Sequence, residues 1–196
     1  PGPQQSPVIK AVYVKGDLKD KPIITEYTAG DLWMSTWADD GNLYSGWGDG
    51  SGFYQNTKAP PTDFGIARLT GDLPNISGVN VYSDAVPVDK TLAYKEDDKP
   101  SSLIFMDGIL YAQIHRPLED PAVGYLAFSK DYGVTWKRLI DQSPWTKESG
   151  SPFRCLFFIN MGQNYSLNTD GYVYAFGIGK EWGWSGGVYL ARVKKD

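Results

Sequence analysis

Short apolar runs separated by glycine, proline, asparagine and aspartate make up almost the whole chain. The longest segment without glycine or proline, Val88–Lys99, carries no apolar stripe at helical spacing. Apolar runs of strand length bounded by turn residues are typical of β-structure. The pattern therefore predicts an all-β fold. The predicted strands lie within Val8–Val14, Leu32–Ala38, Leu43–Trp47, Phe64–Leu69, Leu103–Met106, Ile109–Ile114, Val123–Phe128, Cys155–Ile159, Tyr172–Phe176 and Val188–Val193.

Three of the turns share the pattern Asp-Gly-x-Leu/Val-Tyr, at Asp40–Tyr44, Asp107–Tyr111 and Asp170–Tyr174. An Asp-Gly pair between two apolar runs predicts a hairpin. Each hairpin precedes another apolar run with a central alanine, so the unit repeats. Radial repetition of small antiparallel sheets is the pattern of a β-propeller. We therefore predict one propeller domain over residues 1–196, partial in extent, with repeats at roughly 23–85, 86–145 and 146–196.

Ser129–Trp136 reads S-x-D-x-G-x-T-W, the Asp-box of sialidase-like propellers. In such a turn we expect Asp131 to accept backbone amides, Gly133 to take a special φ angle and Trp136 to pack beneath. This turn lies on the outer edge of a blade, which favours a structural role. Three blades are fewer than common propellers contain, so the chain is expected to be part of a larger propeller or to complete one with another chain.

Composition narrows the function classes. With 19 basic and 23 acidic residues the net charge is −4, which argues against a nucleic-acid partner. No run of apolar residues is long enough to span a membrane, and the single cysteine, Cys155, excludes an intramolecular disulfide. The chain opens on Pro1 without Met or a signal-like segment, and we interpret it as a processed or trimmed form of a secreted or periplasmic protein. The triplets at Asn75 and Asn164 fit N-glycosylation and give this interpretation weak support.

The segment Asp31–Gly50 resembles the opening blade of a sialidase-like, five-bladed propeller family. Many members carry a "domain of unknown function" label, and relatives include endo-D-arabinan-degrading glycoside hydrolases. The resemblance extends through Lys99–Leu103, the Asp-box, Phe157–Tyr165 and Leu190–Val193. It covers the family's first three blades and implies a carbohydrate-active protein, with a glycoside hydrolase as the leading interpretation.

Glycoside hydrolysis needs two carboxyl groups across the scissile bond. Asp31 precedes the first strand of the opening blade and Asp49 ends the next, and a hairpin returns both to one rim. In the resembling hydrolases an Asp-Leu and a Gly-Asp at these places carry the acids, so Asp31 and Asp49 are the predicted catalytic pair. The alternatives are that Asp31 caps a turn and that Asp49 belongs to a Gly-Asp-Gly loop. Asp39 and Asp40, at the hairpin turn, compete for the role.

Residues of several types are candidates for substrate binding. Aromatic rings stack on sugars, a neutral imidazole bonds a hydroxyl or tunes a carboxylate, and arginine holds a carboxylate in its ionised form. The alternatives are core packing for the tryptophans and a surface or partly buried His-Arg pair. The candidates are Trp33, Trp47, Asp39, His115, Arg116, Arg154 and Trp182.

No zinc spacing, phosphate loop or Gly-x-Ser-x-Gly elbow is present, so we expect no cofactor. Asp39, Asp40 and Asp49 leave calcium open, although their spacing does not match an EF-hand. Five arginines, none in the inner strand of the first blade, argue against a true sialidase. The second functional class is a non-catalytic glycan-binding or assembly module.

Overall fold

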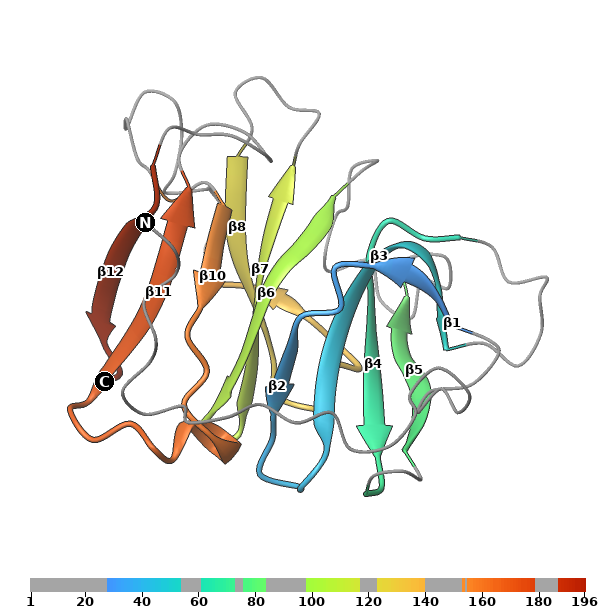
Figure 1. Ribbon diagram of the computed structural model, residues 1–196, viewed down its shortest axis with the longest axis horizontal. Coiled ribbons are helices and arrows are strands. Elements are labelled where there is room, and N and C mark those ends of the chain that lie inside the picture. The colour runs from blue at the N-terminus through green and yellow to red at the C-terminus, as the bar shows by residue number, and fades with distance from the viewer. Residues whose placement is uncertain are drawn as a thin grey trace, which may run out of the picture.

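The computed structural model describes residues 28–53, 61–72, 76–83, 98–116, 123–139, 153, 155–178 and 187–196. Within them the chain forms three antiparallel sheets (Figure 1) and one short 3-10 turn, η1, at Gln163–Tyr165. The predicted strand Val8–Val14 lies outside the described residues. The all-β prediction is confirmed.

The first sheet contains β1 to β5. Its strands are β1 (Thr28–Asp31), β2 (Ser35–Trp37), β3 (Leu43–Phe53), β4 (Gly65–Thr70) and β5 (Ser77–Ser83). The strands β2, β3, β4 and β5 form a meander in chain order, and β1 pairs with the far half of β3. The second half of β3 therefore lies between β1 and the turn that leads into β4.

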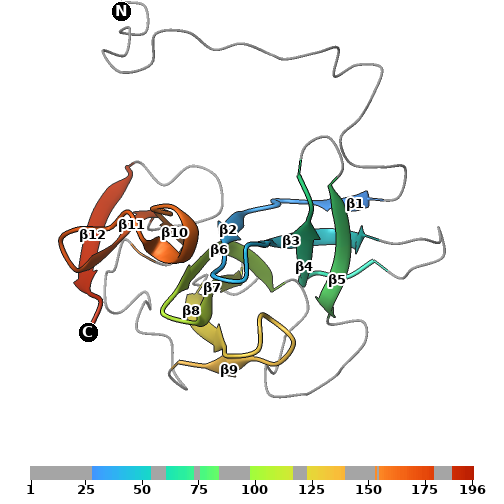
Figure 2. The ribbon, with the colours of Figure 1, turned by 90° about the horizontal axis from the view of Figure 1, so that it is seen from below.

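The second and third sheets repeat the meander. The second contains β6 (Lys99–Met106), β7 (Ile109–Arg116), β8 (Val123–Ser129) and β9 (Lys137–Arg138). The third contains β10 (Cys155–Phe158), β11 (Tyr172–Ile178) and β12 (Tyr189–Lys194). Seen from below, β2, β6 and β10 lie nearest one another while β5, β9 and β12 lie outside (Figure 2). Three sheets arranged radially, with β2, β6 and β10 innermost, form a partial β-propeller.

The Asp-Gly turns show why their motif recurs. Gly41 has a φ of +83°, a value that favours glycine, and an added Cβ there would meet no atom within 4 Å, so the conformation alone requires the glycine. Asp40 accepts the backbone N–H of Asn42 at 3.0 Å and the hydroxyl of Tyr44 at 2.8 Å. Asp170 accepts the hydroxyl of Tyr174 in the same way. The repeated aspartate and tyrosine therefore lock the turn onto its strand.

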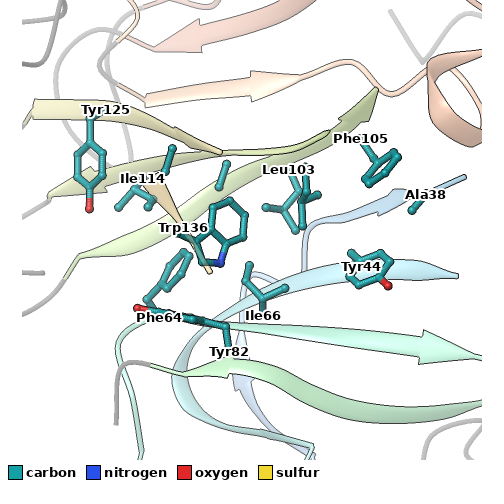
Figure 3. Packing of buried hydrophobic residues seen from close by; sticks show 13 residues of the cluster. Ala38, Tyr44, Phe64, Ile66, Tyr82, Leu103, Phe105, Ile114, Tyr125 and Trp136 are labelled. Carbon is teal, nitrogen blue, oxygen red and sulfur yellow. The ribbon is translucent and has the colours of Figure 1, made fainter. Parts of the chain in front are cut away.

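Apolar side chains fill the space between the sheets. Between the first two sheets the buried cluster contains Phe64, Ile66, Leu103, Phe105 and Trp136 among others (Figure 3). A smaller cluster of Ile104, Tyr165 and Val173 joins the second and third sheets. Alternate residues of β6 thus face opposite neighbours, as the two-residue period of a strand requires.

Candidate functional site

The predicted acids lie at the end of the blades opposite the Asp-Gly turns. Asp31 is the last residue of β1 and pairs with Gly48 of β3, directly before Asp49. The carboxylate Oδ1 of Asp31 lies 3.2 Å from the place that a Cβ on residue 48 would take. Two acids from separate strands therefore reach one rim, as the hairpin argument predicted, although β1 itself was not predicted.

Both acids sit in an unusual stretch of backbone. Asp49 has a φ of +48°, and Leu32 and Trp33, directly after Asp31, have φ angles of +71° and +27°. Non-glycine residues rarely adopt this left-handed region, and such strain gathers at functional sites. Asp49 lies inside β3, not in a loop, so the Gly-Asp-Gly loop alternative is wrong.

Two further charged residues, which the sequence analysis missed, belong to this rim. The ammonium Nζ of Lys99, at the start of β6, forms an ion pair with Asp49 and lies 3.0 Å from Oδ1 of Asp63. The Lys99 side chain is 7% exposed, whereas that of Asp49 is 58% exposed. No local motif marks these residues, because Lys99 meets Asp49 and Asp63 only after two blades have packed together.

Trp33 lies beside the acids. Its ring is half-buried, stacks on Trp47 with 5.9 Å between ring centroids and meets Phe53 edge-on. Its indole N–H donates to the carbonyl of Gly30 at 3.0 Å, which fixes the ring's orientation. Trp47, by contrast, is fully buried, with its own N–H on the carbonyl of Gly50. The prediction that Trp47 contacts a ligand is wrong, because a buried ring has no free face; it supports Trp33 instead.

Asp39 and Asp40 lie at the other end of the blade. The register pairs Trp37 with Leu43 next to the turn and Asp31 with Gly48 at the rim, so five residues of β3, about 17 Å at strand rise, separate the two ends. Asp39 accepts the hydroxyl of Tyr132 at 3.0 Å, and this bond raises the pKa of Tyr132. Burial acts to raise the pKa of Asp40, but hydrogen bonds from Asn42 and Tyr44 outweigh it and the pKa is lowered. The structure does not bring either residue to the predicted pair.

Of the remaining predicted binding residues, only His115 has a described side chain, and it is buried. His115 pairs with Lys99 across β6 and β7 and is 4% exposed, and its contact with a sugar hydroxyl or a carboxylate stays a prediction. Arg116 ends β7 opposite Val123, but its side chain is outside the described part of the chain. Arg154 and Trp182 also lie outside the described residues.

The turn at Ser129–Trp136 has the local geometry expected from its sequence. Asp131 accepts the N–H of Thr135 at 2.9 Å, Gly133 has a φ of +89°, and Trp136 is buried with its indole N–H on the carbonyl of Gly133. These contacts serve the turn and lie away from the acids.

The described residues offer little for nucleophilic catalysis by a thiol, for metal binding or for a membrane-spanning helix. Cys155 is buried, which raises its pKa to about 12 although a Ser101 hydrogen bond acts to lower it, so the thiol is a poor nucleophile. Across the described ranges, no three His, Cys, Asp or Glu side chains lie close enough to hold a metal ion. None of the described helical segments is long and apolar enough to cross a membrane.

Comparison with known proteins gives structural likeness only. No protein-family model and no curated protein matches the chain. Among solved structures it is similar to a family 117 glycoside hydrolase of the marine bacterium Zobellia galactanivorans, with 12% identity, a TM-score of 0.45, and coverage of 79% of this chain and 40% of that one. It is also similar to the Hadza microbial sialidase Hz136, with 15% identity, a TM-score of 0.42, and coverage of 83% of this chain and 31% of that one. It is similar as well to the GH43 endo-arabinanase from Bacillus licheniformis, with 16% identity, a TM-score of 0.44, and coverage of 87% of this chain and 54% of that one.

The chain thus spans between 31% and 54% of the length of these three proteins. Because the TM-scores stay below 0.5, the propeller assignment comes from the three radial sheets of the chain itself.

Proposed function

We propose that the chain belongs to a carbohydrate-active propeller that hydrolyses glycosidic bonds, with Asp31 and Asp49 as the carboxylate pair. The observation that supports the proposal is that Asp31 pairs with Gly48, the residue directly before Asp49, so two exposed acids come from neighbouring strands at one end of the first sheet. Acid–base hydrolysis requires two carboxyl groups that flank the scissile bond. The site's polysaccharide or glycan substrate, and a secreted location, are part of the same proposal.

Trp33 gives the rim its second property. A half-buried indole that is held by one hydrogen bond and backed by another ring presents a fixed apolar surface. A rigid aromatic face binds the C–H face of a sugar at little entropic cost. We therefore assign Trp33 to substrate binding next to the acids.

The test is hydrolysis of a panel of polysaccharides that includes arabinan, measured by the release of reducing ends. We expect Asp31→Asn and Asp49→Asn each to lower the rate at least about 100-fold, because each removes a group that transfers a proton or forms a bond in the transition state. The stability of Asp31→Asn should stay within about 1 kcal/mol of the parent, since its side chain is exposed, whereas Asp49→Asn also removes a partner of the buried Lys99 ammonium and should cost more. Asp72→Asn, an exposed aspartate after β4, is the matched control. Full activity of either site variant would refute the pair.

A second candidate is an assembly module that completes its propeller with another chain. On the third sheet Phe176 and Leu190 are register partners, 44% and 61% exposed, and Val193 is 64% exposed. Exposed apolar groups of this kind mark interaction surfaces. Light scattering of the native protein distinguishes the cases: a particle larger than one 21.7 kDa chain supports assembly, and a monomer counts against it. Glycan binding without hydrolysis would favour the non-catalytic module.

A further inference from the structure

Lys99 occupies an unusual place for a lysine. It is the first residue of β6, the innermost strand of the second sheet, and its side chain is 7% exposed. Lysine is rarely buried unless its charge is paired, because removing an ammonium from water is costly. The contacts that offset this cost therefore indicate what the residue does.

Those contacts come from the first sheet. The ammonium meets Asp49 of β3 and Asp63, two residues before β4. Asp63 is kept near Asp49 by a backbone bridge, in which Gly50 donates to the carbonyl of Thr62 at 3.1 Å and Thr62 donates back at 2.8 Å. One lysine of the second blade thus joins two carboxylates of the first.

The backbone of β3 leaves room for the lysine stem. A Cβ on Gly48 would lie 3.3 Å from Cδ of Lys99 and 3.2 Å from Oδ1 of Asp31, closer than most real contacts. The glycine between Asp31 and Asp49 in the rim therefore lets Lys99 pass close beneath both acids. On the neighbouring strand β7, His115 pairs with Lys99. Asp98, the residue before Lys99, is buried and accepts a hydrogen bond from the hydroxyl of Tyr125 at 3.1 Å.

We infer that Lys99 is a positioning residue for the catalytic carboxylate of Asp49, with Asp63 as the anchor that holds the ammonium in place. This inference rests on the proposed function. The Asp49 side chain is 58% exposed and its backbone is left-handed, so without the ion pair it has room to rotate away from Asp31. Lys99 supplies a charged hydrogen bond from a rigid inner strand, and Asp63 prevents the ammonium from following Asp49 into solvent.

The first experiment measures kcat and KM for Lys99→Met, which keeps the stem and removes the charge. We expect kcat on the hydrolysed polysaccharide to fall about 10- to 100-fold with KM within about two-fold, because misplacement by about 1 Å costs rates of that order. Lys99→Arg should recover part of the loss. Lys195→Met is the matched control, since Lys195 forms a similar ion pair of 2.8 Å with Asp107, at an Asp-Gly turn. Its kcat should equal that of the parent.

A second measurement is independent of activity. In protein labelled with ¹³C at aspartate carboxyl groups, the resonances of Asp49 and Asp63, assigned with the Asn variants, should move in Lys99→Met and stay in place in Lys195→Met. Asp63→Asn, which leaves the Lys99–Asp49 pair intact, replaces Lys99→Met if the latter does not fold, and should move the Asp49 resonance and lower kcat to a smaller extent.

The outcomes distinguish the positioning role of Lys99 from the proposed hydrolysis by Asp31 and Asp49. An unchanged kcat in folded Lys99→Met, or an Asp49 resonance that does not move, overturns the positioning role even if Asp31→Asn and Asp49→Asn are inactive. If the parent hydrolyses no polysaccharide, the proposed reaction fails and the resonance shifts alone decide whether Lys99 holds Asp49. A lower melting temperature with unchanged kcat would show that Lys99 serves only the packing of the blades.

Discussion

Asn160 connects all three blades, and its removal tests whether their inner strands are held by hydrogen bonds as well as by apolar packing. It follows β10 in the third blade. Its side-chain amide donates to the carbonyls of Ser35 and Leu103, both at 3.2 Å, and its Oδ1 accepts the hydroxyl of Thr36 at 2.7 Å. Thr36 in turn accepts the backbone N–H of Phe105 at 2.9 Å.

The expected cost follows from these contacts. Asn160→Ala removes three hydrogen bonds, each worth about 0.5–1.5 kcal/mol net, and leaves buried Thr36 short of a partner. We expect a loss of about 2–4 kcal/mol in the free energy of unfolding. Asn160→Asp keeps the acceptor for Thr36 but turns a carboxylate oxygen toward the carbonyls of Ser35 and Leu103, so it should cost at least as much as Asn160→Ala. Thr36→Val removes the hydroxyl that joins Asn160 to Phe105 and should cost about 1–3 kcal/mol.

A double-mutant cycle in urea measures the link directly. If the two side chains act as one connection, the Asn160→Ala, Thr36→Val double variant should be less destabilised than the sum of the single variants by at least about 1 kcal/mol. Additive effects within about 0.3–0.5 kcal/mol would refute the connection. A cost below about 0.5 kcal/mol for Asn160→Ala alone would show that apolar packing suffices to hold the blades.

Three further predictions concern packing, acid stability and reactivity. In Gly65→Ala the new Cβ would lie 2.1 Å from Cζ2 of buried Trp47, so urea unfolding should show a loss of at least about 1–3 kcal/mol. Burial acts to raise the pKa of Asp131, but hydrogen bonds from Thr135 and Ser129 outweigh it, so the pKa is lowered. The ionised carboxylate therefore stabilises the folded state above about pH 4, and this stabilisation is lost as the pH falls through the folded pKa. In that acidic range the difference in unfolding free energy between the parent and Asp131→Asn should narrow. A thiol reagent at pH 8 should leave buried Cys155 unmodified in the folded protein and label it in urea, and rapid labelling without urea would contradict its burial.

Much of the fold could be predicted from local signals. The Asp-Gly turns specify hairpins because their glycines take a positive φ and their aspartates bind the following strand. Nine of the ten predicted strand segments overlap strands in the described residues, and the tenth lies outside them. The strands β1, β5 and β9 were missed because they are polar or short, and β1 forms only by pairing with the extended half of β3.

The site could be predicted only in part. The convergence of Asp31 and Asp49 follows from hairpin geometry, which the sequence does reveal. Trp47 was misjudged because residue type does not show that a ring is covered by its own sheet, here by Trp33 and the backbone at Gly52 and Gly65. Lys99 escaped notice for the complementary reason: its partners lie about 36 and 50 positions earlier in the chain, and no local spacing connects them.

The two ends of the blades differ in a way that bears on where function resides. At the turn end, aspartate, glycine and tyrosine recur in every repeat, as expected of groups that make the same hairpin three times. Nine residues after the repeated aspartate the sequence has Asp49, then Arg116, then Gly179; the first two lie at the rim end, and Gly179 lies outside the described residues. A position that a common fold does not hold constant is free to carry chemistry, and at this rim the first acid is bound by a lysine of the next blade. Because the pair spans two blades, any movement between them also moves Asp49, so the packing that stabilises the propeller sets the geometry of the proposed reaction.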